Sequence, residues 1–194
     1  MGLRICVKYI VGYCRKKVNK IQGGRYCYIG KGTNIVNGCR IVVKENVSIR
    51  KYCDLFAGKY IEIGKGCDIG TRNRIVGNVI IEDYVLFGPD NYICSSDHKY
   101  EDVSIPIIHS GTYEVNRNGH SDLKIGSGSW IGTHVAIIGD VHIGKHCVIG
   151  ANSVVTKDIP DYCVAVGLPA RVIKKYNAES KVWEKICHEN INAC

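Results

Sequence analysis

The chain lacks several features that would assign it to a broad class at once. Its 194 residues include only 4 prolines and 1 methionine, and no low-complexity tract, which excludes collagen-like and largely disordered chains. No apolar run reaches the roughly eighteen residues needed to span a membrane. Arg4 and Lys8 interrupt the start, which does not resemble a secretory signal, so we expect one cytoplasmic domain.

Pairing signals for the cysteines are also missing. There are 11 cysteines, an odd number, with no CxxC pair and no export signal. Neither a disulfide framework nor a zinc ribbon is therefore expected. A free cysteine can instead behave as a small buried apolar side chain. We predict free thiols in the core and no metal site.

Acidic residues are outnumbered by basic ones. The 26 Lys and Arg residues against 18 Asp and Glu give a net charge of +8, which favours an anionic partner such as a nucleic acid, a membrane surface or a phosphorylated ligand. Aromatic residues make up 8% of the chain and form no basic–aromatic motif of an RNA-binding module. Nucleic acid is therefore not the expected partner.

Aliphatic residues recur at every sixth position over most of the chain. The series comprises Ile29, Ile35, Ile41, Val47, Ile63, Ile69, Ile75, Ile81, Phe87, Ile93, Ile125, Ile131, Ile137, Ile143, Ile149 and Val155. A period of six fits short strands joined by tight turns, with three strands closing each coil of a parallel β-helix. We predict an all-β fold with these side chains inside. Cys27, Cys39, Cys67 and Cys147 fall in a second, smaller interior position.

The repeat loses its phase at two places. Between Val47 and Ile63 the spacing is not a multiple of six, which indicates a bulge or small insertion near residues 50–60. A second change of phase frames residues 95–124, which are polar and rich in turn formers. We interpret this second segment as a loop extruded from the coil, and long loops in compact domains are more often functional than not.

Both ends of the chain depart from the sixfold period. Residues 3–19 place apolar side chains at helical spacing among basic ones, which predicts an amphipathic cap on the first coil, with membrane-surface contact as the alternative. A second helix is expected over 177–191, with Val182, Trp183 and Ile186 facing inward. The expected division is 1–25 for the N-terminal helix, 26–175 for the β-helix and 176–194 for the C-terminal helix.

Three runs late in the repeat carry a family signature. They are WIG at 130–132, IGANSVVTKDIP at 149–160 and GLPAR at 167–171. Together they closely resemble the hexapeptide-repeat acyltransferases, most of all the galactoside and maltose O-acetyltransferases and their relatives that acetylate polysaccharide sugars. The resemblance implies a left-handed parallel β-helix, acetyl-CoA as donor, a homotrimer, and active sites between neighbouring subunits.

The same resemblance implies a catalytic base in the extruded loop. His98, preceded by Asp97, matches the family's general base. A sugar hydroxyl is a poor nucleophile at neutral pH, and imidazole titrates in the range that suits removal of its proton. Asp97 would orient the imidazole or support its positive charge, and His109 and His120 are the runner-up bases. The remaining histidines, expected at the surface, are His134, His142, His146 and His188.

Matches to the donor site lie in the later coils. Trp130 and Thr133 match positions near the thioester, where the Thr133 N–H would help hold an oxyanion. Ala151 matches a position whose backbone contacts the pantetheine arm. Lysine and arginine suit the phosphates of CoA. The matches at that phosphate end are Thr156, Lys157 and Arg171.

The predicted reaction is metal-free acetyl transfer from acetyl-CoA to a hydroxyl of a sugar or saccharide precursor. The N-terminal segment and the loop differ from the galactoside and maltose enzymes, which favours polysaccharide precursors as acceptors. An amino sugar or serine stays open as acceptor, because the same base and donor site would serve. Other classes are a silent β-helix scaffold, a zinc carbonic anhydrase using His142 and His146, and a covalent route through Cys94, and none explains the three family runs as well.

Overall fold

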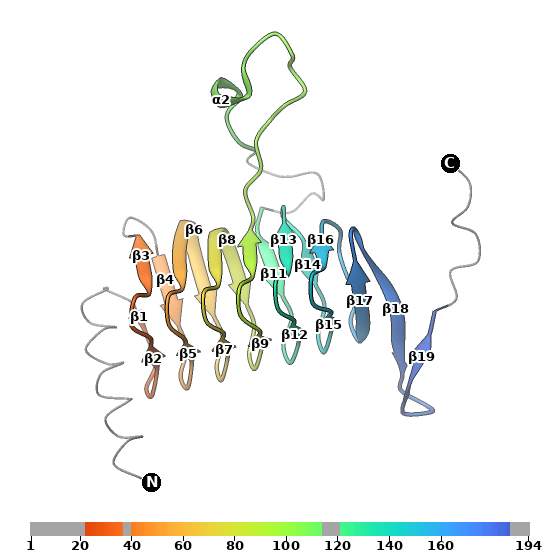
Figure 1. The fold of residues 1–194 in the computed structure, drawn as a ribbon. Coiled ribbons are helices and arrows are strands. Elements are labelled where there is room, and N and C mark those ends of the chain that lie inside the picture. The colour runs from red at the N-terminus through yellow and green to blue at the C-terminus, as the bar shows by residue number, and fades with distance from the viewer. Residues whose placement is uncertain (1–21, 37–39, 114–120, 187–194) are drawn as a thin grey trace.

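The chain forms a three-sided β-solenoid in a computed structural model, which describes residues 22–36, 40–113 and 121–186 (Figure 1). Each coil adds one short strand to each side, and the strands of successive coils pair in parallel. Four sequence predictions lie outside the described residues: the helix over 3–19, and the places of Cys39, His120 and His188.

We name the three sides face A, face B and face C. Face A comprises β3 (Asn34–Val36), the first halves of β6 (Asp54–Ile63) and β8 (Arg74–Ile81), β10 (Tyr92–Cys94), β13 (Ala136–Ile138) and β16 (Val154–Val155). Face B comprises β1 (Gln22–Gly23), β4 (Arg40–Val43), the second halves of β6 and β8, β11 (Leu123–Ile125) and β14 (His142–Ile143). Face C comprises β2 (Tyr28–Ile29), β5 (Ser48–Ile49), β7 (Asp68–Ile69), β9 (Leu86–Phe87), β12 (Trp130–Ile131), β15 (Val148–Ile149), β17 (Cys163–Gly167), β18 (Ala170–Asn177) and β19 (Val182–Lys185).

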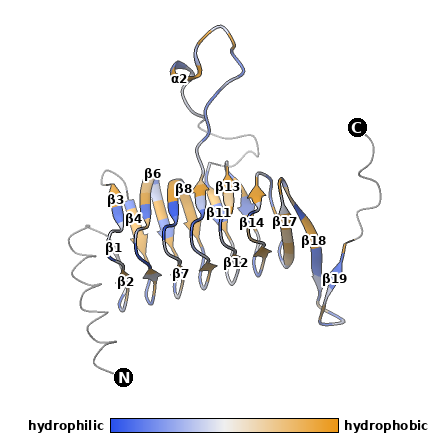
Figure 2. Ribbon diagram, in the orientation of Figure 1, coloured by the Kyte–Doolittle hydropathy of each residue, from blue (hydrophilic) through white to orange (hydrophobic). Residues whose placement is uncertain are grey.

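The interior of the solenoid is a stack of aliphatic side chains. All sixteen residues of the predicted series are buried, and Ile29, Ile49 and Ile69 pair in successive coils. Cys27, Cys67 and Cys147 are buried beside this stack, as predicted. Because burial of apolar surface is the main favourable contribution to folding, the sixfold period specifies the solenoid directly. Figure 2 shows apolar colour on most strands and also near α2.

The first change of phase has two causes. The predicted insertion is confirmed, because the pairing of β6 with β8 shifts between Ala57 and Ile61. An earlier shift also exists, since Ile29 pairs with Ile49, twenty residues on rather than eighteen. Val47 therefore lies two residues before Ile49. Ile41 likewise lies two residues before Val43, because Ile41 pairs with Ile61 and Val43 with Ile63. Both occupy the smaller interior position, so their assignment to the main series was wrong, although both side chains are buried.

The second change of phase is the extruded loop. The chain leaves the solenoid after Cys94, forms the one-turn helix α2 (Ile107–Ser110) and returns at β11. The loop rises clear of the solenoid in Figure 1. Leu123 and Lys124 belong to β11, so the loop ends at residue 122 rather than 124. These two residues belong to the coil because both pair with β8 and Lys124 also pairs with β14.

The described part of the C-terminal segment is not the helix predicted over 177–191. β17, β18 and β19 pair antiparallel, and Val182 and Trp183 lie in β19, 51% and 40% exposed rather than facing inward. Ile186 follows the strand and is exposed as well. The last coil would leave a row of unpaired N–H and C=O groups, which a returning strand can satisfy and a helix cannot. The Trp183 ring packs 5.5 Å from that of Tyr176.

No helix among the described residues is long and apolar enough to cross a membrane.

Candidate active site

His98 lies in a short antiparallel stem at the base of the extruded loop. It forms a β-bridge with Thr112, and its side chain is exposed. The flanking hydrogen bonds run from the Tyr113 N–H to the Asp97 carbonyl oxygen (3.2 Å) and from the Lys99 N–H to the Gly111 carbonyl oxygen (3.1 Å). The stem therefore holds the backbone on both sides of His98 while the imidazole faces solvent.

Asp97 acts on the backbone of its neighbour. Its Oδ1 accepts a hydrogen bond from the His98 N–H at 2.9 Å. This contact stabilises the backbone conformation at His98. His109, the runner-up base that the structure describes, lies at the end of α2 and is exposed.

Trp130, Thr133 and Ala151 gather near the edge between faces C and A. Trp130 is 50% exposed in β12. Thr133 and Ala151 occupy the same turn position in successive coils, joined by a hydrogen bond of 3.0 Å from the Asn152 N–H to the Thr133 carbonyl oxygen. Across the described ranges, the N–H groups of Thr133 and Ala151 donate to no protein acceptor. This edge thus offers two available N–H donors beside an exposed indole ring.

Thr156 and Lys157 lie on a different edge, between faces A and B. Both are exposed and follow β16 directly. The pairing of β10, β13 and β16 aligns Thr156 with Ile138 and with Cys94, the residue from which the loop departs. Arg171 is exposed in β18, where it pairs with Val166.

The predicted site residues do not converge within one chain. Thr133 lies in the turn that precedes β13, and Ile138 is the last residue of that strand, so the two stand at opposite ends of one side of the coil. His98 rises above the A/B edge, whereas Thr133 and Ala151 lie along the C/A edge. One copy therefore carries both halves of the predicted site on separate edges.

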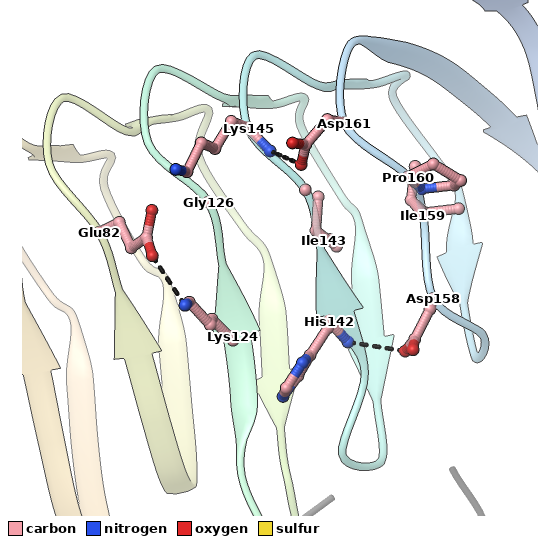
Figure 3. A pocket seen from close by; sticks show the side chains of 11 residues that line it. Glu82, Lys124, Gly126, His142, Ile143, Lys145, Asp158, Ile159, Pro160 and Asp161 are labelled. Carbon is pink, nitrogen blue, oxygen red and sulfur yellow. Dashed lines mark hydrogen bonds and ion pairs between the residues drawn. The ribbon is translucent and has the colours of Figure 1, made fainter.

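A charged groove of about 350 Å³ opens on face B (Figure 3). Burial alone would raise the pKa of Glu82 there, but hydrogen bonds from Lys124 and Ser127 outweigh it and lower the pKa to about 2. The groove is lined by none of the predicted site residues. His142 in the groove contacts Asp122, while His146 stacks on Tyr162, so these two histidines face different partners.

Sequence reasoning missed the residues that hold the foot of the loop. Asn78 contacts both limbs, through Ser95 and Ser121, and Asp122 is held by Tyr60 and His142. The one signal in the sequence is the Gly77–Asn78 pair, a dipeptide typical of a tight bend.

The chain is similar to known transferases in sequence. The family model "Bacterial transferase hexapeptide (six repeats)" matches residues 122–157. The chain is 48% identical over 169 residues to the "Putative lipopolysaccharide biosynthesis O-acetyl transferase WbbJ" of Escherichia coli K12, covering 76% of this chain and 84% of that protein. It is 36% identical over 126 residues to the galactoside O-acetyltransferase of the same organism, covering 63% of this chain.

The extent of the likeness varies among relatives. The chain spans 60% of the length of the galactoside enzyme and less than half of another curated relative. In structure it is similar to AntD, an N-acyltransferase from Bacillus cereus solved with dTDP and 3-hydroxybutyryl-CoA, with a TM-score of 0.72 over 89% of this chain and 92% of that one. At 20% identity this likeness concerns the fold. The chain belongs to the hexapeptide-repeat acyltransferases, in the branch of the galactoside and polysaccharide-biosynthesis O-acetyltransferases, and its fold is their left-handed parallel β-helix.

Proposed function

We propose that the protein transfers an acetyl group from acetyl-CoA to a hydroxyl of a sugar or saccharide precursor, with His98 as general base. The observation that carries this proposal is the exposed imidazole held in a hydrogen-bonded stem above a solenoid that bears the donor signature. Family membership supports the acetyl transfer. The likeness to WbbJ over 84% of its length supports a saccharide acceptor.

The active site forms between copies of the chain in this proposal. The loop carries apolar side chains that face solvent in one copy, with Val103 96% and Ile108 84% exposed. Face C presents Leu86 and Trp130, each about half exposed. Leu86 and Trp130 are neighbours across β9 and β12, and exposed apolar surface of this kind is typical of interaction sites. In a homotrimer, the loop of one copy would bring His98 to the C/A edge of the next.

The chemistry then needs no covalent enzyme intermediate and no metal. His98 takes the proton of the acceptor hydroxyl as its oxygen attacks the thioester carbonyl carbon of acetyl-CoA. The C–O bond forms, and the negative charge on the carbonyl oxygen is held by the N–H of Thr133. The C–S bond then breaks, and the CoA thiolate takes back the proton from the imidazolium. The products are the acetyl ester and CoA.

The remaining contacts concern the carrier portion of the donor. The N–H of Ala151 faces the pantetheine arm along the C/A edge. Thr156, Lys157 and Arg171 bind phosphate oxygens, because cationic and hydroxyl donors are the natural partners of phosphate. Part of the net charge of +8 is thereby used for the donor.

Mass-spectrometric detection of acetylated product tests this function. Wild type, His98→Ala and the matched control His109→Ala, from the same loop, are incubated with acetyl-CoA and a panel of sugars, amino sugars and nucleotide sugars. We expect an O-acetylated product from wild type and control, and a loss of about 10²- to 10⁴-fold in His98→Ala with CoA binding retained. Equal product from His98→Ala would remove His98 from this role, and product only on amines would make the protein an N-acetyltransferase.

A further inference from the structure

One residue of the solenoid, Asn78, contacts both limbs of the extruded loop. Asn78 lies in β8, which pairs with β10 at the foot of the loop (Figure 1). The Asn78 backbone N–H donates to the Oγ of Ser95 on the outgoing limb at 2.7 Å. Its side-chain Nδ2–H donates to the carbonyl oxygen of Ser121 on the returning limb at 3.2 Å. A single residue therefore contacts both ends of the loop.

The side-chain chemistry at this position is specific to asparagine. The Asn78 Oδ1 accepts a hydrogen bond of 2.7 Å from the Lys59 N–H, while its Nδ2 serves Ser121. One side chain must thus accept on one side and donate on the other, which an amide can do and a carboxylate cannot. Lys59 belongs to the insertion in β6, so that insertion orients the amide.

The preceding glycine allows the outgoing limb to approach. Gly77 has φ +94°, and a Cβ at this position would lie 2.2 Å from Ser95 Oγ. Ser95 is buried, and its own N–H donates to the Val76 carbonyl oxygen at 3.1 Å. Gly77 therefore leaves the space that the Ser95 side chain occupies, and Asn78 donates a hydrogen bond to it.

A second contact holds the returning limb next to Ser121. The Tyr60 hydroxyl donates to Asp122 Oδ2 at 3.0 Å, and His142 Nε2 lies 3.0 Å from Asp122 Oδ1. The side chains of Tyr60, Asp122 and His142 are all partly buried on face B. Both limbs thus enter the loop in fixed positions, and His98 follows Ser95 by three residues.

We propose that Asn78 is a positioning residue for His98, holding both limbs of the loop so that the imidazole is presented at a fixed height and direction. This inference rests on the proposed function. Asn78 touches neither substrate nor donor in this account, and acts through Ser95, Ser121 and the stem.

The test compares Asn78→Asp with the matched control Asn34→Asp, an exposed residue of β3 far from the loop. Asn78→Asp keeps an oxygen that accepts from the Lys59 N–H but removes the N–H that donates to Ser121. It also places a carboxylate beside the Ser121 carbonyl oxygen, where the two acceptors repel each other. The loss of one hydrogen bond corresponds to roughly 2- to 10-fold in an equilibrium. We expect amide hydrogen exchange over residues 97–113 to quicken by about that factor, with exchange in the coils unchanged.

Kinetics supply the second measurement on the same variants. We expect kcat of Asn78→Asp to fall by about 3- to 10-fold while KM for acetyl-CoA stays within about twofold of wild type. Ser95→Ala, which removes the contact on the outgoing limb, should behave alike. If amide hydrogen exchange over residues 97–113 is unchanged in Asn78→Asp and Ser95→Ala, Asn78 does not hold the limbs of the loop.

Unchanged kcat beside faster exchange would overturn the positioning role. If His98 is not the general base, the result differs: His98→Ala then keeps full activity, whatever rate of amide hydrogen exchange the loop shows in Asn78→Asp.

Discussion

The Sγ of Cys67 donates a hydrogen bond to the backbone carbonyl oxygen of Glu82 in the next coil, 3.0 Å away. Cys147 makes the same contact to Pro160 at 3.0 Å, and Ser129 uses its hydroxyl in the equivalent position toward Gly144 at 2.9 Å. The side chain in the smaller interior position thus fills space in the core and also donates a hydrogen bond to the carbonyl oxygen of a turn. Cysteine and serine are interchangeable there in hydrogen bonding.

The buried thiols are predicted to be unreactive in the folded protein. Burial raises the pKa of Cys67 and of Cys147 to about 11, so the thiol form dominates at pH 8. We expect iodoacetamide at pH 8 to leave both residues unmodified in the native protein and to label both after unfolding. Peptide mass mapping measures this, and native labelling at a rate close to that of the unfolded chain would contradict it.

Substitutions at Cys147 separate its hydrogen bond from its volume. Cys147→Ser keeps a donor to the Pro160 carbonyl oxygen, so we expect a change within about 1 kcal/mol in the free energy of unfolding. Cys147→Ala removes the donor to the Pro160 carbonyl oxygen and leaves the space of the buried sulfur unfilled, so it should destabilise by about 1–3 kcal/mol. Urea unfolding gives both values. A serine variant less stable than the alanine variant would refute the hydrogen-bonding role.

Gly66 is predicted to be needed because the Tyr84 ring leaves no space for a Cβ at this position. It has φ +70°, and a Cβ would lie 2.6 Å from ring atoms of Tyr84. Gly139 has φ +90° but nothing within 4 Å, so Gly139→Ala measures the backbone cost alone, about 1 kcal/mol. Gly66→Ala should cost about 1 kcal/mol more than that control, and Gly66→Ala with Tyr84→Ala should remove the excess. Equal losses in the two glycine variants would exclude the ring contact.

Glu82 is predicted to make stability depend on acid pH. Its pKa in the folded protein, about 2, lies below the ordinary 4.5, so the ionised carboxylate stabilises the fold above pH 4.5 and this contribution is lost as pH falls toward 2. Glu82→Gln should destabilise by about 1–2 kcal/mol at pH 7, allowing for partial exposure, with the difference from wild type shrinking below pH 4.5.

The control for this pair is Glu62→Gln, whose partner Arg40 is exposed and 3.4 Å away, and it should change stability by less than about 0.5 kcal/mol. Thermal unfolding between pH 2 and 8 measures both variants. A Glu82→Gln deficit that persists undiminished at pH 2 would be inconsistent with the Lys124 and Ser127 contacts as its source.

The solenoid could be predicted from the sequence because its period sits in the buried residues themselves. All sixteen aliphatic positions are interior, and the loop and the insertion in β6 appear as changes of phase. The earlier shift before Val43 was missed, because Ile41 and Val47 are aliphatic and buried although they occupy the smaller interior position. The strand β19 was missed because Val182, Trp183 and Ile186 fit a helix face equally well, and only the open edge of β18 decides between the two.

The sequence names candidate residues for the site but does not show how they are arranged. The family resemblance selects Thr133 and Ala151, yet only the coil register places them on one edge and Thr156 on another. Asn78 gave no chemical signal, because its role depends on partners 17 and 43 residues away in sequence. Contacts of that range follow from the fold rather than from any local pattern.

The Thr133 N–H is predicted to hold the oxyanion, and the chain offers a matched pair of variants. Pro89 occupies the equivalent turn position in the preceding coil, so Thr133→Pro removes the N–H at a place where the fold already accepts proline. Thr133→Ala keeps the N–H and removes the hydroxyl, which donates to the Pro89 carbonyl oxygen at 3.0 Å. We expect kcat to fall by about 10²- to 10³-fold in Thr133→Pro and little in Thr133→Ala. Equal kcat values for the two would exclude the N–H.

The most direct test of the account is co-expression of His98→Ala and Thr133→Pro copies, each inactive alone. If every site takes its base from one copy and its oxyanion donor from the next, random mixed trimers contain both intact halves at about a quarter of their sites. We predict recovery of about a quarter of wild-type product formation, measured by mass spectrometry. Mixed assemblies no more active than either variant alone would contradict a site shared between copies.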